Sequence, residues 1–262
     1  MNVQADTPQV AARREGWVRR HPLVSFFVLA YAISWTAWAG AYLGLGTVGI
    51  AIGGFGPLVA AWIVTRKTDG SVADWVRQIV AWRVAPRFYL YTLGLPALLW
   101  AVMNLVLAAL GEPVRASLLD DRLPAYLATL LLVSMIGGGF EEPGWRGFAL
   151  PRLEHRFSTP VRATLVLAFF WGLWHLPLYG AAFVVPMLYA FFYTYLYNRT
   201  RSVLLCIVLH GGFTAALDNL ILTPDNTKVD LVILMTLVVA TVVLIGLTRG
   251  RLGYAARQSE DR

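Results

Sequence analysis

The chain has 262 residues, of which 58% are hydrophobic and only 14% are charged. This composition excludes an ordinary soluble globular domain and predicts a membrane protein. The formal net charge of +7 indicates an orientation in the membrane and contact with anionic lipid headgroups, and we expect no nucleic acid as a partner. Because Cys206 is the single cysteine, a disulfide framework and a thiolate metal site are also excluded.

Eight stretches of the chain are apolar enough to cross a membrane, which requires about 20 residues as a helix. They span residues 23–43, 48–65, 88–110, 123–150, 160–179, 181–198, 202–222 and 229–248. We therefore expect an all-α, polytopic membrane protein with about eight transmembrane helices. Its expected parts are an N-terminal segment 1–22, a transmembrane domain 23–248 with its polar motifs in 141–214, and a tail 249–262.

The first of these stretches has two interpretations. Residues 13–20 are rich in arginine and precede an apolar run that contains the tripeptide AWA at 37–39, a pattern that resembles a cleavable signal peptide. The apolar run continues past that site to Leu43. We therefore expect the first helix to be retained in the membrane.

Basic residues are distributed unequally among the loops that join the stretches. With successive loops on opposite sides, one side receives 19 of the 22 lysines and arginines, and the other receives only Arg115, Arg122 and Lys228. By the positive-inside rule, both termini are expected in the cytoplasm. Residues 72–83, in a cytoplasmic loop, carry apolar side chains at helical spacing, which predicts a helix lying in the membrane interface.

Polar residues inside a bilayer are costly and usually face a partner or a cavity. Here they are Asn104, Glu141, Glu142, Arg146, His175, His210, Thr214 and Asp218. Counted at ~1.5 Å per residue from the cytoplasmic arginine that ends each span, Glu141 lies about 16 Å deep, His175 about 20 Å and His210 about 13 Å. One acid and two imidazoles from three helices are therefore expected in one layer near the midplane.

Helical spacing assigns different partners to the two adjacent glutamates. Glu142 and Arg146 are four residues apart, which predicts an ion pair, structural or functional. Glu141 is then left without an obvious cation, as expected of a general base. His175 and His210 have the alternative of bonding to backbone carbonyls. The glycines 137–139, 211 and 212 predict close helix packing beside these residues, and His21 and His155 are expected at the surface.

Three short motifs carry a resemblance to a known family. EEPGWR at 141–146 resembles the EExxxR motif, WGLWH at 171–175 followed by LP resembles FxxxH, and HGGFT at 210–214 resembles HxxxN/B. In this order they resemble the CAAX-processing and bacteriocin-processing (CPBP, or Abi) intramembrane endopeptidases, and the chain is similar to type II CAAX prenyl endopeptidases. The resemblance covers at least residues 123–220, and FGPLVAAW at 55–62 is similar to the second helix of many members.

The resemblance implies a role for each matching residue. Glu141 would be the general base that activates water, while Glu142 and Arg146 would order the site. His175 would hold the water or a metal, and His210 would assist in that role or donate to the oxyanion. Whether a divalent metal such as zinc is used stays open; Glu141, His175 and His210 would be its ligands, although the chain lacks the HExxH spacing typical of zinc peptidases.

Two positions differ from the family pattern. Trp171 stands where the second motif has Phe, which keeps an aromatic wall. Thr214 stands where the third motif usually has Asn, which is expected to donate to the tetrahedral intermediate. A threonine hydroxyl can also donate, with shorter reach, and loss of such a donor commonly costs about 10²- to 10³-fold in rate.

Three functions are compatible with these residues. The first is an intramembrane endopeptidase that cleaves a membrane-associated peptide or protein tail with water activated by Glu141. The second is a non-catalytic binding or immunity protein of the same fold. This alternative stays open because Thr214 stands where the family usually has Asn. The third is an ion-coupled transporter, against which the absence of inverted hydropathy halves argues. Twenty Arg against two Lys indicate a GC-rich, bacterial genome, so we expect a multi-pass protein of the bacterial cytoplasmic membrane with the lipid bilayer as its surroundings.

Overall fold

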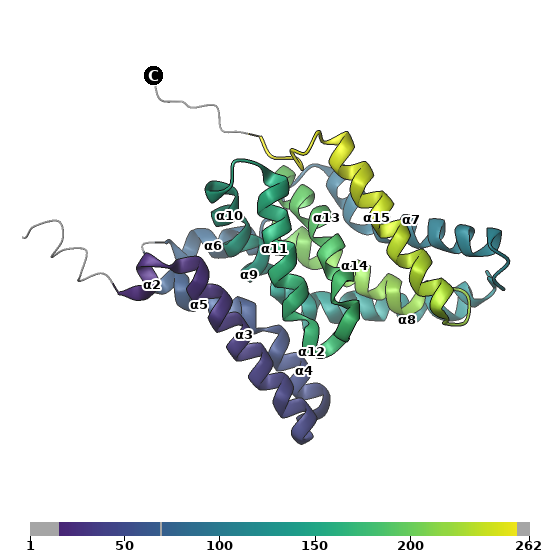
Figure 1. Cartoon of the computed structure of the whole chain (residues 1–262), viewed down its shortest axis with the longest axis horizontal. Helices are drawn as coiled ribbons and strands as arrows, with labels where there is room; N and C mark the ends of the chain where they lie inside the picture. Colours follow the sequence, from purple (N-terminus) through teal and green to yellow (C-terminus); the bar gives the residue numbers. More distant parts are fainter. Residues whose placement is uncertain (1–15, 69, 256–262) are drawn as a thin grey trace, which may run out of the picture.

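The computed structural model describes residues 16–68 and 70–255, and every regular element in these ranges is a helix (Figure 1). Five helical segments are long and apolar enough to cross a membrane: Pro22–Gly54, Pro86–Ala109, Leu118–Arg156, Leu176–Thr200 and Thr227–Leu247. Two further apolar helices, Pro160–Trp174 and Val203–Asn219, are shorter. The all-α, polytopic membrane class is therefore confirmed, whereas the count of eight crossings stays a prediction.

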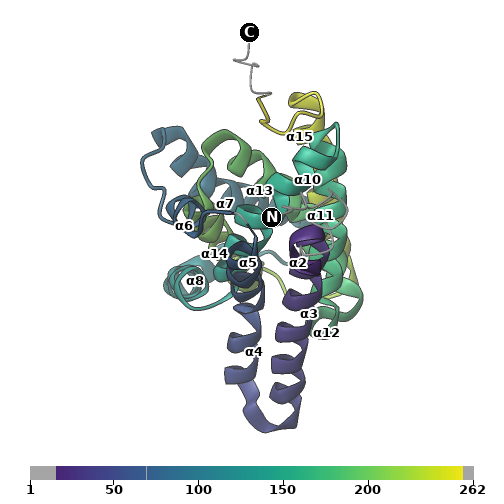
Figure 2. The same ribbon diagram turned by 90° about the vertical axis from the view of Figure 1, so that its left-hand side faces the viewer.

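The first two apolar stretches form a helical hairpin. It consists of α2 (Trp17–Arg20), α3 (Pro22–Gly40), the π-helical turn η1 (Ala41–Leu45), α4 (Gly46–Gly54) and α5 (Gly56–Lys67). Gly44 and Gly46 reverse the chain with φ angles of 120° and 53°, values that glycine adopts without strain. Figure 2 shows α3 and α4 lying side by side and projecting beyond the other helices.

The fourth apolar stretch, expected as one helix over 123–150, is broken into several pieces, so that expectation is wrong. Helix α8 (Leu118–Met135) stops before Gly137, and four short helices follow: η2 (Gly138–Glu141), α9 (Glu142–Gly144), the π-helical η3 (Trp145–Ala149) and α10 (Leu150–Arg156). Three consecutive glycines and Pro143 are poor formers of a continuous helix, which explains the break. The break redirects the chain, so that Glu141 ends the short helix η2 and does not lie within a long helix.

Helix α14 lies at the centre of the remaining helices, as Figure 1 shows. These are α7 (Pro86–Ala109), α11 (Pro160–Trp174), α12 (Leu176–Tyr179), η4 (Gly180–Phe183), α13 (Val184–Thr200), α14 (Val203–Asn219) and α15 (Thr227–Leu247). A Cβ atom on Gly211 would lie 2.5 Å from the Leu130 carbonyl of α8, and one on Gly212 would lie 3.0 Å from Pro96 of α7. The predicted role of these glycines in close packing is thus confirmed.

Helix α6 (Val72–Ile79) forms where the sequence predicts an interfacial helix, but one of its faces is buried in the protein. Ser71 caps the helix by accepting from Asp74 N–H. Trp75 is buried and donates its indole N–H to the Pro143 carbonyl at 2.9 Å, and Gln78 donates to the Gly147 carbonyl at 3.3 Å. A helix resting only on lipid would not make these bonds. Helix α6 therefore supports the short helices that carry the acidic pair.

Loops that the distribution of basic residues assigns to the same side of the membrane contact each other in the structure. At one end, the Ser202 hydroxyl donates to the Ala81 carbonyl at 2.5 Å, and Asn198 donates to the Leu252 carbonyl at 3.2 Å. The loop 80–85, the turn after α13 and the start of the predicted tail therefore share one end. The predicted segment 1–22 lies mostly outside the described residues, as does the tail beyond residue 255.

At the other end, the loop between α7 and α8 contacts the loop between α14 and α15. Arg115 N–H donates to the Leu222 carbonyl at 2.9 Å, and Glu112 accepts from Asn226 at 3.1 Å and pairs with Lys228. Hydrogen bonds from Lys228 and Asn226 lower the pKa of Glu112, so this carboxylate stays ionised at neutral pH. The two loops assigned to the extracytoplasmic side thus lie together, as the charge distribution requires.

Reporter fusions test this orientation directly. Fusions after residues 115 and 225 should report the extracytoplasmic side, and fusions after residues 80 and 255 should report the cytoplasm, because 19 of the 22 basic residues fall on the second side. Alkaline phosphatase and green fluorescent protein provide opposite readouts. A cytoplasmic signal at residue 115 would refute the predicted topology.

Candidate active site

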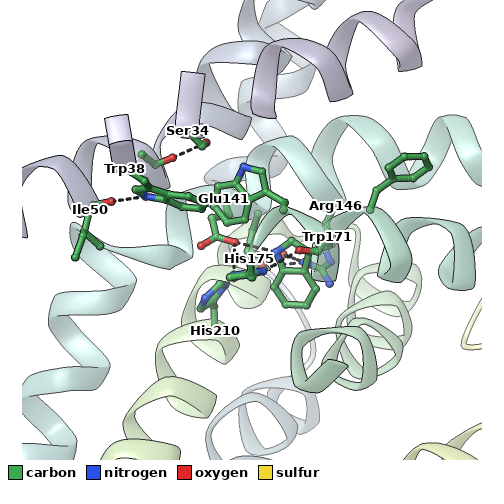
Figure 3. Close-up of polar contacts among 12 residues, drawn as sticks. Ser34, Trp38, Ile50, Glu141, Arg146, Trp171, His175 and His210 are labelled. Carbon is green, nitrogen blue, oxygen red and sulfur yellow. Dashed lines mark hydrogen bonds and ion pairs between the residues drawn. The ribbon is translucent and has the colours of Figure 1, made fainter. Parts of the chain in front are cut away.

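The carboxylate of Glu141 lies in a buried polar contact between the broken fourth stretch and α11. Glu141 is only 4% exposed, and its Oε2 atom accepts the indole N–H of Trp171 at 2.8 Å. The Nε2 atom of His175 lies 3.7 Å from the same oxygen. Figure 3 shows these three side chains converging, with His210 beside them. The acid and the two histidines expected in one layer are thus brought together.

The ring of His175 has a defined tautomer and orientation. Its Nδ1 atom lies 2.8 Å from the Trp171 carbonyl, which can only accept, so Nδ1 carries a proton. In the neutral ring Nε2 then has a free lone pair, and this is the atom that faces Glu141. Tyr179 stacks on the imidazole at 5.1 Å with an interplanar angle of 9°. The backbone bond that the sequence left as an alternative therefore orients His175 toward the acid.

The second glutamate, Glu142, is the centre of a separate buried charge cluster. Arg146 Nη1 lies 3.0 Å from its Oε1 atom and 2.9 Å from its Oε2 atom. His210 Nδ1 also lies 2.9 Å from Oε1. Neither side chain of the Glu142–Arg146 pair is exposed to solvent. The predicted i,i+4 ion pair is present, and His210 joins it from α14.

Two aromatic rings enclose the guanidinium of Arg146. Its Cζ atom lies 4.1 Å from the ring centre of Trp171 and 4.3 Å from that of Tyr193. Stacking on aromatic faces compensates part of the cost of burying a cation. Trp171 therefore contacts both clusters, since its N–H binds Glu141 while its ring faces Arg146.

A cavity of about 510 Å³ lies against this site, between α13, α14 and α15. Trp171, His175, His210 and Thr214 form part of its wall. Glu141 is not part of that wall, but it contacts Trp171 and His175, which are. Thr214 is partly exposed and lies one turn beyond His210 on the same stripe. The cavity thus places a bound molecule next to both histidines and the threonine.

Sequence reasoning missed several residues that shape this site. Trp171 was expected only to maintain an aromatic wall, whereas its N–H donates to the carboxylate of Glu141. Tyr193 and Trp75 were not connected with the site at all. For Trp171 the sequence contains a signal of this role. Tryptophan has an N–H donor that phenylalanine lacks, and Trp171 lies one helical turn before His175. His21 and His155 are exposed, as predicted.

Whether Glu141, His175 and His210 hold a divalent metal stays a prediction. Within the described ranges, no three His, Cys, Asp or Glu side chains are grouped so that they could hold a metal ion. No step of the chemistry below is therefore assigned to a metal.

Gly138 provides a test of how closely the site is packed. A Cβ atom at this position would lie 2.5 Å from His210 Nε2 and 3.0 Å from Glu141 Oε1. Gly138→Ala should therefore displace His210 from Glu142 and lower the stability of the protein by about 1–3 kcal/mol. Thermal unfolding in detergent measures this effect.

Gly94 in α7 is the matched control, because nothing lies within 4 Å of a Cβ atom there. Gly94→Ala should leave the stability unchanged or raise it by up to about 1 kcal/mol. If both variants melted at the wild-type temperature, the close contact between Gly138 and His210 would be wrong.

Comparison with known proteins agrees with the motifs. A family model described as type II CAAX prenyl endopeptidase Rce1-like matches residues 123–216. The curated protein CAAX prenyl protease 2 of Methanococcus maripaludis (strain DSM 14266) is 30% identical over 135 residues, which cover 44% of this chain and 49% of that relative. The chain thus spans about half the length of the curated relative it matches. Residues 123–216, which contain all three motifs, are therefore similar to the type II CAAX prenyl endopeptidase Rce1-like family, in agreement with the resemblance that the motifs carry.

Proposed function

We propose that the protein is an intramembrane endopeptidase that cleaves a membrane-associated peptide or protein tail with water activated by Glu141. The observation that carries this proposal is the buried Glu141 carboxylate, 3.7 Å from His175 Nε2. Both atoms are hydrogen-bond acceptors. A water molecule about 2.8 Å from each would donate one proton to each and direct its lone pair toward a substrate carbonyl.

Hydrolysis then follows from these positions. The water oxygen attacks the carbonyl carbon while Glu141 takes one of its protons. The C–N bond breaks when Glu141 transfers that proton to the leaving nitrogen, which gives an amine and a carboxylic acid that keeps the second proton of the water. Trp171 N–H holds the carboxylate of Glu141 in place through both steps. Burial in low-dielectric surroundings makes a charged carboxylate less favourable than it is in water, so a glutamate there takes up a proton readily.

The Glu142 cluster would stabilise the negative charge that develops on the carbonyl oxygen. Glu142 accepts from His210 Nδ1, and in a protonated His210 the opposite ring atom, Nε2, would donate to the oxyanion. Arg146 holds Glu142 in place for this role. Thr214, one turn along α14, would add a second donor to the oxyanion. The two glutamates thus have separate roles, Glu141 as base and Glu142 as positioning residue.

Substrate class and location are proposals that rest on the membrane fold and the family. The cavity has mainly apolar and aromatic walls and lies among membrane helices, which suits a peptide that enters from or near the lipid. The relative from Methanococcus maripaludis is named CAAX prenyl protease 2. For this chain we propose a membrane-associated peptide or protein tail, in the cytoplasmic membrane of a bacterium.

Substitution of the base and of its histidine neighbour tests the mechanism. Glu141→Gln and His175→Ala should each lower cleavage by at least about 10²-fold, because Gln cannot take the proton of the attacking water and Ala removes its second acceptor. Comparing the membrane proteomes of cells that carry wild type and Glu141→Gln would reveal the substrate as an uncut protein that accumulates. A fluorogenic peptide based on that protein then measures the rates.

His155→Ala is the matched control, because His155 is an exposed histidine outside the site. It should cleave at the wild-type rate. Full activity of Glu141→Gln on an identified substrate would exclude Glu141 as the base.

Thr214 separates the enzyme from the non-catalytic alternative. In an active peptidase, Thr214→Val keeps the shape of the side chain but removes the donor, so kcat should fall by roughly 10- to 1000-fold with little change in binding. Thr214→Asn restores the family pattern and should preserve or raise the rate. A pure binding protein has no transition state to stabilise, so only its affinity would change.

Thr248→Val is the control for loss of a hydroxyl, because Thr248 donates to the Leu244 carbonyl at the end of α15, outside the cavity. Equal rates for wild type and Thr214→Val would remove this hydroxyl from the mechanism. Absence of cleavage by wild type and by Thr214→Asn alike would favour the binding protein.

A further inference from the structure

A hollow separate from the candidate active site lies where membrane helices end. It has a volume of about 690 Å³ and is formed by the turn between α10 and α11 and by residues 251–255, which follow α15 at the same end of the molecule (Figure 1). Its wall includes Arg156 and Arg251, together with His155 and Ser158. None of the candidate catalytic residues belongs to this wall. A molecule bound here would therefore act independently of the proposed cleavage.

The two arginines of the wall have no opposing charge within the described part of the chain. Both are exposed, and neither guanidinium forms an ion pair with a described residue. The wall also contains a carboxylate, Glu154, but this side chain is buried and has partners of its own. Glu154 accepts from Asn198 at 2.6 Å, and its Oε2 atom lies 3.9 Å from Arg201 Nη1. Because Arg201 opposes the charge of Glu154, Arg156 and Arg251 make the hollow electropositive.

The start of α11 adds to this positive potential. Helix α11 has 15 residues, and Pro160, its first residue, belongs to the wall. The N-terminus of a helix carries a partial positive charge and favours an anion next to it. Ser158, which is exposed in the same wall, supplies a hydroxyl that can donate. Two guanidinium groups, a helix N-terminus and a hydroxyl thus surround one hollow.

The segment that carries Arg251 is fixed against the helices and does not hang free. Arg249 and Leu252 have φ angles of 50° and 42°, in the left-handed region that residues other than glycine rarely adopt. Leu252 is fully buried, and its carbonyl accepts from Asn198 of α13 at 3.2 Å. A backbone in this region persists only where its surroundings hold it, and it is found most often at functional sites. Packing therefore keeps Arg251 in the same wall as Arg156.

The position of the hollow along the membrane helices indicates which anion it meets. The segment Leu118–Arg156 is long and apolar enough to cross the membrane and ends at Arg156, and Thr227–Leu247 ends shortly before Arg251. Basic residues at such ends lie at the depth of the lipid headgroups. Tyr254, another wall residue, is of a type that is enriched at this depth. Arginine suits a phosphate there, because its planar group can donate two parallel hydrogen bonds.

We propose that this hollow binds the phosphate group of an anionic membrane lipid between Arg156 and Arg251. The bound phosphate connects α10, which belongs to the segment of the acidic pair, with the end of α15. Helix α15 packs mainly on α13 and α7, and its Ile233 and Leu234 belong to the wall of the cavity beside the site. The lipid thus adds a contact that holds α15 over this cavity. A general attraction of basic loops to anionic lipids requires no such defined place.

Lipid titration tests the proposal and requires no turnover. The purified protein in a neutral detergent is titrated with phosphatidylglycerol or with phosphatidylcholine of the same acyl chains, and native mass spectrometry measures the Kd of the first lipid bound. Phosphatidylglycerol should bind at least about 10-fold more tightly, because its headgroup carries a net negative charge for two guanidinium groups to bind. Arg156→Gln with Arg251→Gln should reduce this preference to less than about threefold.

The matched control removes the same charge from arginines outside the hollow. Arg20 and Arg83 are exposed and assigned to the same side of the membrane, so Arg20→Gln with Arg83→Gln should keep the preference. Ser158→Trp changes no charge but places a large ring in the hollow, and it should lower the preference to less than about threefold as well. Because Ser158 is exposed in a turn, this variant tests the site even if the arginine variant fails to fold.

Inorganic phosphate distinguishes a lipid from a free anion as the occupant. Because acyl chains add to the affinity of a lipid, about 1 mM inorganic phosphate should change the Kd of phosphatidylglycerol by less than about twofold. Displacement of the lipid at this concentration would indicate a site for free phosphate and overturn the assignment to a lipid. Equal Kd values of the two lipids for the wild type, including no binding of either, would overturn the site.

The variants separate a defined site from a general attraction of charges. A preference that survives both Arg156→Gln with Arg251→Gln and Ser158→Trp would overturn the proposal, as would an equal loss in the control pair Arg20→Gln with Arg83→Gln. Loss of the preference in the hollow variants alone would support the site, whether or not the protein cleaves peptides.

Discussion

The buried carboxylate of Glu142 is the interaction on which the rest of the site depends. It receives Arg146 from its own segment and His210 from α14, at distances of 2.9 to 3.0 Å. An ionised carboxylate without partners would be very costly in this environment. With two partners it instead joins the broken fourth stretch to the central helix. Such a pair is retained for geometry more than for stability, since well-packed apolar residues can replace buried pairs at little cost.

The pairing of Glu142 explains why its neighbour can have a different role. Adjacent residues in helical backbone point about 100° apart, so Glu141 cannot reach the same partners. It contacts Trp171 on α11 and His175, which follows α11 directly, instead. Trp171 connects the two clusters through its N–H and its ring face. Two carboxylates that are neighbours in the sequence thus acquire different environments. Glu142 is paired with the cation of Arg146, whereas Glu141 contacts the side chains of Trp171 and His175.

Much of this arrangement could be predicted because it follows from local spacing. The i,i+4 pair of Glu142 and Arg146, the packing role of Gly211 and Gly212, and the helical class all depend on distances along one helix. The break near Gly137 was missed because the apolar run continues through it, and hydropathy does not register backbone direction. The buried face of α6 was missed because the bond from Trp75 to the Pro143 carbonyl joins residues 68 positions apart. Amphipathic spacing is the same for lipid and for protein neighbours.

Helix α14 organises the molecule along its own axis as well as across it. It begins next to the basic turn at Arg201, and the loop that follows it includes Asp225. Between these ends, His210, Thr214 and Asp218 follow one another at single turns along one stripe, so each faces the same cavity at a different depth. Gly211 and Gly212, next to His210, let α7 and α8 pack closely on this helix. Because close packing leaves α14 little freedom to rotate or slide, the distance from the histidine to the carboxylate is set by the rise of one rigid helix.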